Sequence, residues 1–314
     1  MRRRDILKTI ALGGAATVIR PFSSFGSFDV LAQTSNADPT GPADLVAVLG
    51  GEPAEMLDQA LYELGGIGRF VRTGNKVVIK PNIGWDNSPE EAGNSNPELI
   101  AALVRHCLEA GAAKVSVLDH TCDQWNACYS NSGIEAAVKA AGGEMLPAHN
   151  QATYQEVALP RAKVLKKAKI HRAIMESDAW FNVPILKTHG GAGMTVSMKN
   201  LMGIVWDRGY FHWNDLNQCI ADICTLPKPP VLNIVDAYRV LLEGGPRGGR
   251  GKDVAMAKGL FASPDMVAVD TAAIRFFGQL RAMPLQNIAY LQKGAELAVG
   301  TTDLDTLAIK RVKI

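Results

Sequence analysis

Residues 184–205, PILKTHGGAGMTVSMKNLMGIV, decide the fold class of this chain. The apolar run over residues 179–186 predicts a buried strand, which ends where Lys187 and His189 begin. Three glycines come next: Gly190, Gly191 and Gly193. Residues 196–202 then have the apolar spacing of a helix. A strand, a charged tip, a glycine loop and a helix form the layout by which open α/β sheets hold a ligand.

The side chains of this stretch indicate that the ligand is negatively charged. Lys187 and His189 lie at the tip, and Lys199 and Asn200 follow in the predicted helix. Backbone N–H groups of the loop and of a helix N-terminus attract anions as well. The glycines do not form a Walker loop, because no Lys-Ser or Lys-Thr follows them at the required offset. We therefore expect a small anionic molecule as the partner of this segment.

The rest of the chain alternates between predicted strands and helices. Apolar strands over residues 76–79, 114–118 and 231–235 are separated by helices, one of which starts with Asn96 as its N-cap. This alternation predicts a mostly parallel central sheet with helices on both faces. Residues 155–170 instead predict a β-hairpin, which would make one edge of the sheet antiparallel.

The first 32 residues resemble an export signal. Arg3 and Arg4 open the segment RRDILK, which resembles the twin-arginine motif. The apolar segment that follows, residues 10–19, is shorter than the roughly 20 apolar residues of a membrane span. A small-residue pattern ending at Ala32 predicts cleavage before Gln33.

We therefore expect the twin-arginine machinery to export the folded chain to the periplasm, with no stable transmembrane span after cleavage. Retention of the segment as an anchor at the outer face of the inner membrane is the alternative. Residues 33–44 predict a flexible lead, and residues 45–314 predict a single α/β domain. Export in the folded state is compatible with a cofactor inserted beforehand.

The charge of the chain argues against a nucleic-acid partner. The sequence has 33 basic and 31 acidic residues, and 28 and 29 remain once residues 1–32 are removed. A nearly neutral chain lacks the basic excess that nucleic acids require. The 47% of hydrophobic residues is typical of a globular protein with a sizeable core.

Candidate functional residues directly follow predicted strands. They are Lys80, Asn82, Asp119, His120, Lys187, His189, Asp236 and Asp265. Because the carboxyl ends of parallel strands meet at one edge of a sheet, we expect a shared pocket there. The expected catalytic residues are Lys187, His189 and Lys80. The expected substrate-binding residues are Asn82, Lys199, Asn200, Gly190, Gly191, Gly193 and Asp236.

Three lysines in one dry pocket restrict its chemistry. Desolvation and like charge both lower the pKa of a lysine, so Lys80, Lys187 and Lys199 require an anion or the loss of a proton. The pocket is then an anion clamp, or it contains a neutral lysine acting as base or nucleophile. His189 is a further candidate for a general acid or base. In the alternative, each lysine pairs separately with a carboxylate of Asp222, Asp236 or Asp270.

The cysteines give little support for a metal. Their five positions contain no C-x-x-C or iron–sulfur spacing. The candidate metal ligands are His120, Cys122 and Cys128. The alternative, in an oxidising compartment, is a disulfide between Cys122 and Cys128.

An aromatic segment follows the predicted helix of the opening stretch. Its members are Trp206, Tyr210, Phe211, His212 and Trp213. These rings either wall the pocket or pack in the core.

Six segments resemble successive blocks of the family called domain of unknown function 362. They are VVIKPN (77–82), EAGAAKV (109–115), NVPILKTH (182–189), SMKNLMGI (197–204), NIVDA (233–237) and ASPDMVAVD (262–270). The family is named for lacking an assigned reaction. Many relatives carry ferredoxin-like iron–sulfur segments, so the resemblance implies redox chemistry and an iron–sulfur or other metal cofactor, but this chain has no such segment.

We therefore expect an exported enzyme that acts on a small anionic substrate, in the manner of an oxidoreductase or of an isomerase or racemase. The competing hypothesis is a non-catalytic periplasmic module that binds an anionic metabolite or a partner protein.

Overall fold

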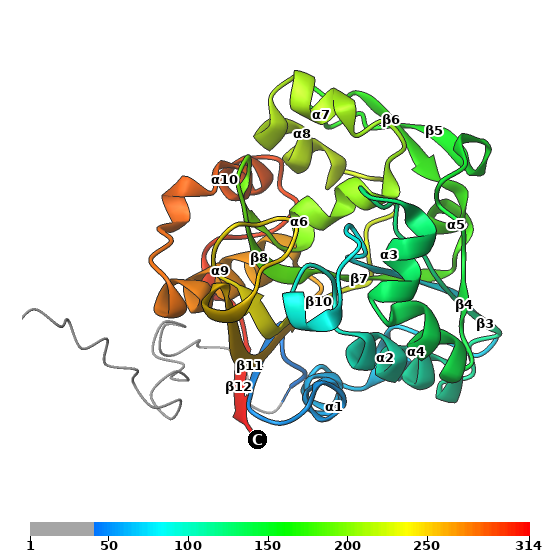
Figure 1. Ribbon diagram of the computed structural model, residues 1–314, viewed down its shortest axis with the longest axis vertical. Coiled ribbons are helices and arrows are strands. Elements are labelled where there is room, and N and C mark those ends of the chain that lie inside the picture. Colours follow the sequence, from blue (N-terminus) through cyan, green and yellow to red (C-terminus); the bar gives the residue numbers. More distant parts are fainter. Residues whose placement is uncertain (1–40) are drawn as a thin grey trace, which may run out of the picture.

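A computed structural model describes residues 41–314 (Figure 1). The predicted export signal and most of the predicted lead, residues 33–40, lie outside the described residues. The end of that lead already belongs to the fold, because Ala43 is buried and its N–H donates to Glu63 O at 2.9 Å. Within residues 41–314, no helix is long and apolar enough to cross a membrane.

A sheet of ten strands forms the centre of the fold, in the order β12-β1-β11-β10-β7-β2-β3-β4, with β8 paired to β10 and β9. Its strands are β1 (Leu45–Leu49), β2 (Lys76–Pro81), β3 (Lys114–Val117), β4 (Glu144–Met145), β7 (Ala179–Val183), β8 (Ile185–His189), β9 (Gly193–Thr195), β10 (Leu232–Leu241), β11 (Val254–Ser263) and β12 (Ile309–Lys313). Most strand pairs are parallel, which confirms the predicted α/β class. Antiparallel pairing occurs inside the sheet, where β11 runs opposite to β1 and β10.

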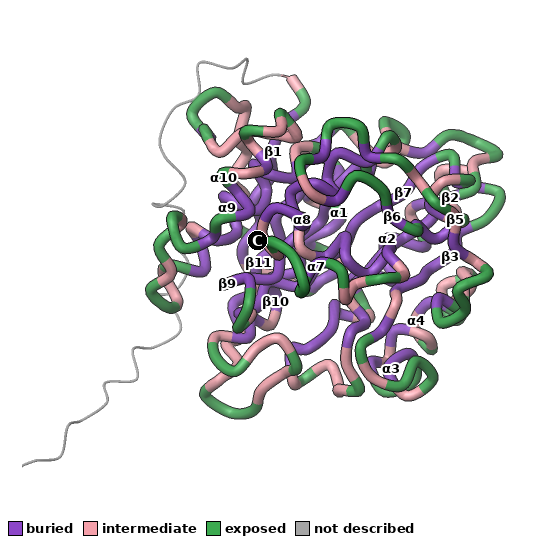
Figure 2. The backbone as a smooth tube through the Cα atoms, turned by 90° about the horizontal axis from the view of Figure 1, so that it is seen from above, coloured by how far each residue is buried: buried purple, intermediate pink, exposed green. Residues whose placement is uncertain are grey.

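Helices cover both faces of the sheet. They are α1 (Pro53–Glu63), α2 (Pro97–Glu109), α3 (Trp125–Asn131), α4 (Ile134–Ala140), α5 (Arg172–Glu176), α6 (Ser197–Asn200), α7 (Gly209–Trp213), α8 (Leu216–Ile223), α9 (Met266–Leu280) and α10 (Ala289–Glu296). Side chains alternate along a strand, so Val46 and Val48 of β1 share a core with α1, α2 and α4. Ala47 belongs to the opposite core, with α8, α9 and α10. Figure 2 shows the buried backbone between these layers.

The predicted strand over residues 179–186 is two strands. Pro184 has no N–H to donate and interrupts the strand between β7 and β8. The chain after β8 then turns back into β9, where sequence reasoning placed a glycine loop and a helix. Gly193 has φ +76°, and a Cβ there would lie 2.5 Å from Ile288 Cδ1, so this turn requires glycine. The helix itself, α6, is short and continues as a 3₁₀ turn over Leu201–Ile204.

The predicted hairpin forms a separate small sheet. Its strands, β5 (Tyr154–Ala158) and β6 (Lys167–His171), pair only with each other within the described sheets. An isolated β-bridge joins Ile170 of β6 to Val205, the residue directly after the 3₁₀ turn over Leu201–Ile204. The hairpin is therefore fixed beside the segment that leads into α7.

Candidate functional site

A cavity of about 430 Å³ lies at the carboxyl ends of β2, β3 and β8. The residues that line it include Lys80, Asn82, Asp119, His120, Cys122, Lys187, His189, Thr195, Lys199, Asn200, Arg208, His212 and Pro246. The structure thus brings six predicted site residues together: Lys80, Asn82, Lys187, His189, Lys199 and Asn200. Their roles stay predictions.

Lys80 is fully engaged within the protein. Its ammonium group donates to Pro81 O at 2.7 Å and to Asn200 Oδ1 at 2.8 Å, and lies 2.9 Å from Asp119 Oδ1. Burial lowers the pKa of Lys80, and the carboxylate of Asp119 opposes that shift. Since an ammonium has three donors, Lys80 has none left for a ligand.

A chain of buried asparagine amides supports the base of the cavity. Asn82 Nδ2 donates to Asn200 Oδ1 at 2.9 Å, and Asn200 Nδ2 donates to Asn182 Oδ1 at 2.9 Å. Asn182 Nδ2 in turn donates to Asn233 Oδ1 at 2.9 Å. The chain of amides connects the carboxyl ends of β2 and β7 and the start of β10 to α6, so it fixes these segments relative to one another.

Lys187 has one free hydrogen-bonding position. Its Nζ donates to Gly93 O at 2.5 Å and to Asn82 Oδ1 at 3.1 Å, and no carboxylate contacts it among the described residues. Burial, aided by the nearby charges of Lys199 and Lys80, lowers the pKa of Lys187 to about 7. Two acceptors hold two of its hydrogens in either charge state, so the third position can carry a proton or a lone pair.

Lys199 has no partner for its ammonium group in the part of the chain that the structure describes. Burial lowers its pKa to about 8, and the charges of Arg208 and Lys80 act in the same direction. All three of its donors are available to a ligand.

Arg208 completes the positive lining and was missed by sequence reasoning. Its guanidinium donates to His120 O at 2.7 Å and Thr121 O at 2.6 Å, and it contacts Cys122 Sγ at 3.2 Å. These are backbone and thiol contacts, so its charge is not neutralised. Asp119 is the one carboxylate among the residues that line the cavity, and Lys80 engages it. The only sequence signal for Arg208 was a basic residue within the aromatic segment.

His189 is held as a neutral donor. Its Nδ1 accepts hydrogen bonds from the N–H groups of Gly191 at 3.1 Å and Ala192 at 3.2 Å. Burial and the charges of Lys199 and Lys187 lower its pKa to about 3. Nδ1 is therefore unavailable as a base, and Nε2 carries the hydrogen that a ligand would accept.

The alternative hypothesis paired each lysine with the carboxylate of Asp222, Asp236 or Asp270. All three carboxylates instead accept hydrogen bonds from backbone N–H groups. Asp222 accepts the N–H groups of residues 163–165 at 2.6–2.8 Å. Asp270 accepts those of Ser197 and Met198 at 2.7 and 2.9 Å. Asp236 accepts those of Asn96 and Tyr238 at 2.7 and 3.0 Å. None of the three pairs with a cavity lysine.

Four predicted substrate-binding residues do not line the cavity: Asp236, Gly190, Gly191 and Gly193. Asp236 does not follow a strand as predicted, because β10 continues to Leu241; its buried carboxylate accepts the N–H of Asn96, the N-cap residue of α2. The glycines form the β8–β9 turn, and their backbone serves to position His189.

The metal candidates do not form a metal site. Within residues 41–314, no cluster of three or more His, Cys, Asp or Glu side chains could hold an ion. His120 Nδ1 donates to Val205 O at 3.0 Å, and its ring stacks on Trp206. Cys122 is exposed and Cys128 buried, and both are free thiols rather than a disulfide.

The aromatic segment serves both of its predicted purposes. Phe211 is in the core, whereas His212 lines the cavity. Trp206 and Tyr210 line a neighbouring groove, and Trp213 is 87% exposed.

The chain belongs to the family described as domain of unknown function (DUF362), whose model matches residues 77–275. This match confirms the resemblance drawn from the six sequence blocks. The thylakoid-associated protein sll1697 of Synechocystis sp. (strain ATCC 27184 / PCC 6803 / Kazusa) is 26% identical over 217 residues. The alignment covers 67% of this chain and 65% of that relative, so the chain spans less than two thirds of the relative's length.

A solved structure is also similar, that of the lactate racemase apoprotein from Thermoanaerobacterium thermosaccharolyticum. The two chains share 13% identity with a TM-score of 0.45, over 73% of this chain and 56% of the racemase.

Proposed function

We propose that the cavity binds a small anion carrying at least two negative charges, and that Lys187 transfers a proton to or from the bound substrate. The observation that carries this proposal is the group of three cations that have no carboxylate partner within residues 41–314, Lys187, Lys199 and Arg208. Lys187 is buried, and Lys199 and Arg208 are partly buried. Buried charges are normally paired, so a ligand is the natural counterion for this group.

The lining suits a carboxylate or phosphate group. Lys199 and Arg208 supply charge, and His189 Nε2 supplies a neutral donor. The volume of about 430 Å³ lies within the range of small-molecule sites, roughly 300–1,000 Å³. Lys80 and Asn200 do not compete for the anion, because their polar atoms are engaged with each other and with neighbouring residues.

Lys187 is the group best suited to move a proton. A pKa of about 7 gives comparable amounts of ammonium and amine at neutral pH. Its contacts with Gly93 O and Asn82 Oδ1 hold the nitrogen in place in both states. Proton transfer next to a carboxylate, as in an isomerase or racemase, is the reaction class that this arrangement favours.

A non-catalytic anion-binding module is the second candidate. It is favoured by Lys199, whose three unengaged donors suffice to bind an anion without any proton transfer. Exposure of the protein to candidate carboxylates in D₂O separates the two functions. Deuterium incorporation next to the carboxylate, lost in Lys187→Gln, supports catalysis, whereas binding without exchange supports the module.

Export by the twin-arginine route is also part of the proposal. It rests on the sequence of residues 1–32, above all Arg3 and Arg4. Replacing both arginines with lysine should retain the protein in the cytoplasm, as measured by fractionation. Unchanged export would remove this part of the proposal.

Calorimetric titration with inorganic phosphate tests the binding site. We expect Lys199→Met to weaken phosphate binding at least about tenfold, because a hydrogen bond to a charged group contributes roughly 1.5–3 kcal/mol. Lys139→Met is the matched control, since Lys139 pairs with Glu135 on an exposed face of α4. Equal phosphate affinity in Lys199→Met and Lys139→Met would contradict the proposed site.

A further inference from the structure

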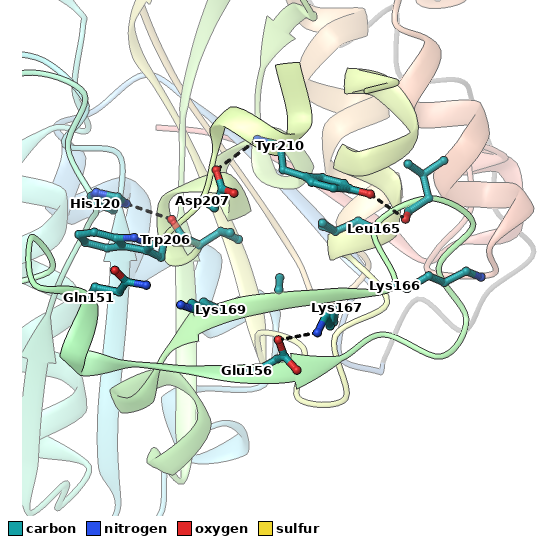
Figure 3. Close-up of a pocket in the computed structure, with 13 residues that line it drawn as sticks. His120, Gln151, Glu156, Leu165, Lys166, Lys167, Lys169, Trp206, Asp207 and Tyr210 are labelled. Carbon is teal, nitrogen blue, oxygen red and sulfur yellow. Dashed lines mark hydrogen bonds and ion pairs between the residues drawn. The ribbon is translucent and has the colours of Figure 1, made fainter. Parts of the chain in front are cut away.

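A second hollow adjoins the cationic cavity. This groove has a volume of about 690 Å³ and lies between the β5–β6 hairpin and the segment over residues 205–210. Figure 3 shows Lys167 and Lys169 on the hairpin side, with Trp206 and Tyr210 across from them. The mechanism proposed above uses none of these side chains.

The groove and the cavity share one wall. Met202, Gly203, Arg208, Gly209 and His212 line the cavity, whereas Val205, Trp206, Asp207 and Tyr210 of the same segment line the groove. His120 lines both hollows, and its ring stacks on that of Trp206 with centroids 5.1 Å apart. His120 is therefore the side chain that the two hollows share, and Trp206 stacks on it on the groove side.

The wall is fixed to the hairpin at two points. The backbone N–H of Trp206 donates to Lys169 O at 2.9 Å. The Tyr210 hydroxyl donates to Val164 O at 3.4 Å, and this bond is a dashed line in Figure 3. These contacts fix the segment over residues 205–210 relative to the hairpin.

The chemistry of the groove differs from that of the cavity. Its apolar lining consists of Val164, Leu165, Ala168, Val205 and the rings of Trp206 and Tyr210. Its lysines are exposed, and Lys167 pairs with Glu156 at 2.9 Å. A hollow of this kind takes an apolar or aromatic group, whose burial away from water favours binding.

We propose that the groove holds the apolar part of a substrate whose anionic group is bound in the cationic cavity. The substrate class is then an alkyl- or aryl-substituted carboxylate or phosphate that extends past His120 from the cavity into the groove. This inference rests on the proposed function, since the anion fixes one end of the molecule. Tyr210 becomes a specificity-determining residue.

A homologous series of ligands tests the inference. Calorimetry compares inorganic phosphate with methyl, butyl and hexyl phosphate, whose chains reach different distances from the anion. We expect hexyl phosphate to bind at least tenfold more tightly than inorganic phosphate. Tyr210→Ala should remove most of this advantage and leave the affinity for inorganic phosphate unchanged.

Trp213→Ala is the matched control, because Trp213 is on the same helix, α7, but is 87% exposed and does not line the groove. It should change neither affinity. Inorganic phosphate binding without any gain from the longer chains would overturn this inference alone. A gain that Tyr210→Ala and Trp213→Ala reduce equally would also overturn it. If none of the ligands binds, the proposed function fails, and this inference fails with it.

Discussion

Two groups of buried charge in this protein are treated in opposite ways. The carboxylates of Asp222, Asp236 and Asp270 are buried, and each is matched by backbone N–H groups. The ammonium groups of Lys187 and Lys199 face a cavity and have no carboxylate partner in the described residues. The carboxylates stabilise the fold, whereas the two ammonium groups are available to bind a ligand.

A charged side chain whose donors or acceptors are all used within the protein is structural, whereas one with unused donors is available for function. Asp222 connects α8 to the turn over residues 163–165, and Asp270 connects α9 to the start of α6. Lys80 belongs with them, because all three of its donors are used. Proximity to the cavity alone would have placed Lys80 among the functional residues.

Lys80→Met should have the largest effect on stability. It leaves the buried carboxylate of Asp119 without its cation, and breaking a buried pair in this way costs about 3–5 kcal/mol. Urea denaturation measures the free energy of unfolding. A loss below about 1 kcal/mol would show that Lys80 is not the structural member of the lysine group.

Asp222→Ala should cost nearly as much. It leaves the N–H groups of Lys163, Val164 and Leu165 without their acceptor. Only Leu165 is fully buried, and an unsatisfied buried group costs about 1–3 kcal/mol. Asp222→Asn keeps one oxygen and should lose less. Phosphate affinity should remain that of the wild type in both folded variants, because Asp222 does not line the cavity. A large loss of phosphate affinity without a loss of stability would show that Asp222 serves the binding site and not the fold.

Lys199→Met should raise the stability of the ligand-free protein by about 1 kcal/mol at pH 6. The change removes a desolvated charge next to Arg208 and Lys80, and apolar replacements of buried charges are often stabilising. Denaturation with and without phosphate measures both states. A clear loss of stability without ligand would mean that the charge of Lys199 is compensated inside the fold.

The last prediction concerns the pH dependence of stability. Lys187 has a pKa of about 7 in the folded protein and about 10.4 when unfolded, so between these values the unfolded chain binds the extra proton. Stability from this group therefore rises with pH across that window, by at most about 1.4 kcal/mol per pH unit. Lys187→Met should flatten the profile of the ligand-free protein between pH 7 and 10. Parallel profiles for the two proteins would show that Lys187 stays charged.

The sequence was sufficient for the α/β class with a mostly parallel sheet and for most of the cavity. Strand periodicity placed Lys80, Asn82, Lys187 and His189 at strand ends, and parallel strands bring their ends to one edge. Lys199 and Asn200 entered the site because α6 follows directly after the β8–β9 turn.

The remaining features depend on contacts between distant segments. Nothing near Asp236 in the sequence shows that its carboxylate accepts the N–H of Asn96, the N-cap residue of α2, because Asn96 lies 140 positions away. Arg208 reaches the cavity through its contacts with the carbonyls of His120 and Thr121 on another strand end. The break at Pro184 was not predicted either, because the residues on both sides of it belong to one apolar run, residues 179–186, and are buried.

The most direct test of the uncompensated charge is the number of protons taken up when an anion binds. Calorimetric titration with sulfate at pH 8.5, in two buffers of different ionisation enthalpy, measures this number. The account predicts uptake of up to two protons per sulfate, because the anion restores the charged forms of Lys187 and Lys199, and reduced uptake in Lys187→Met. Sulfate binding without proton uptake, or with equal uptake in Lys187→Met, would contradict it.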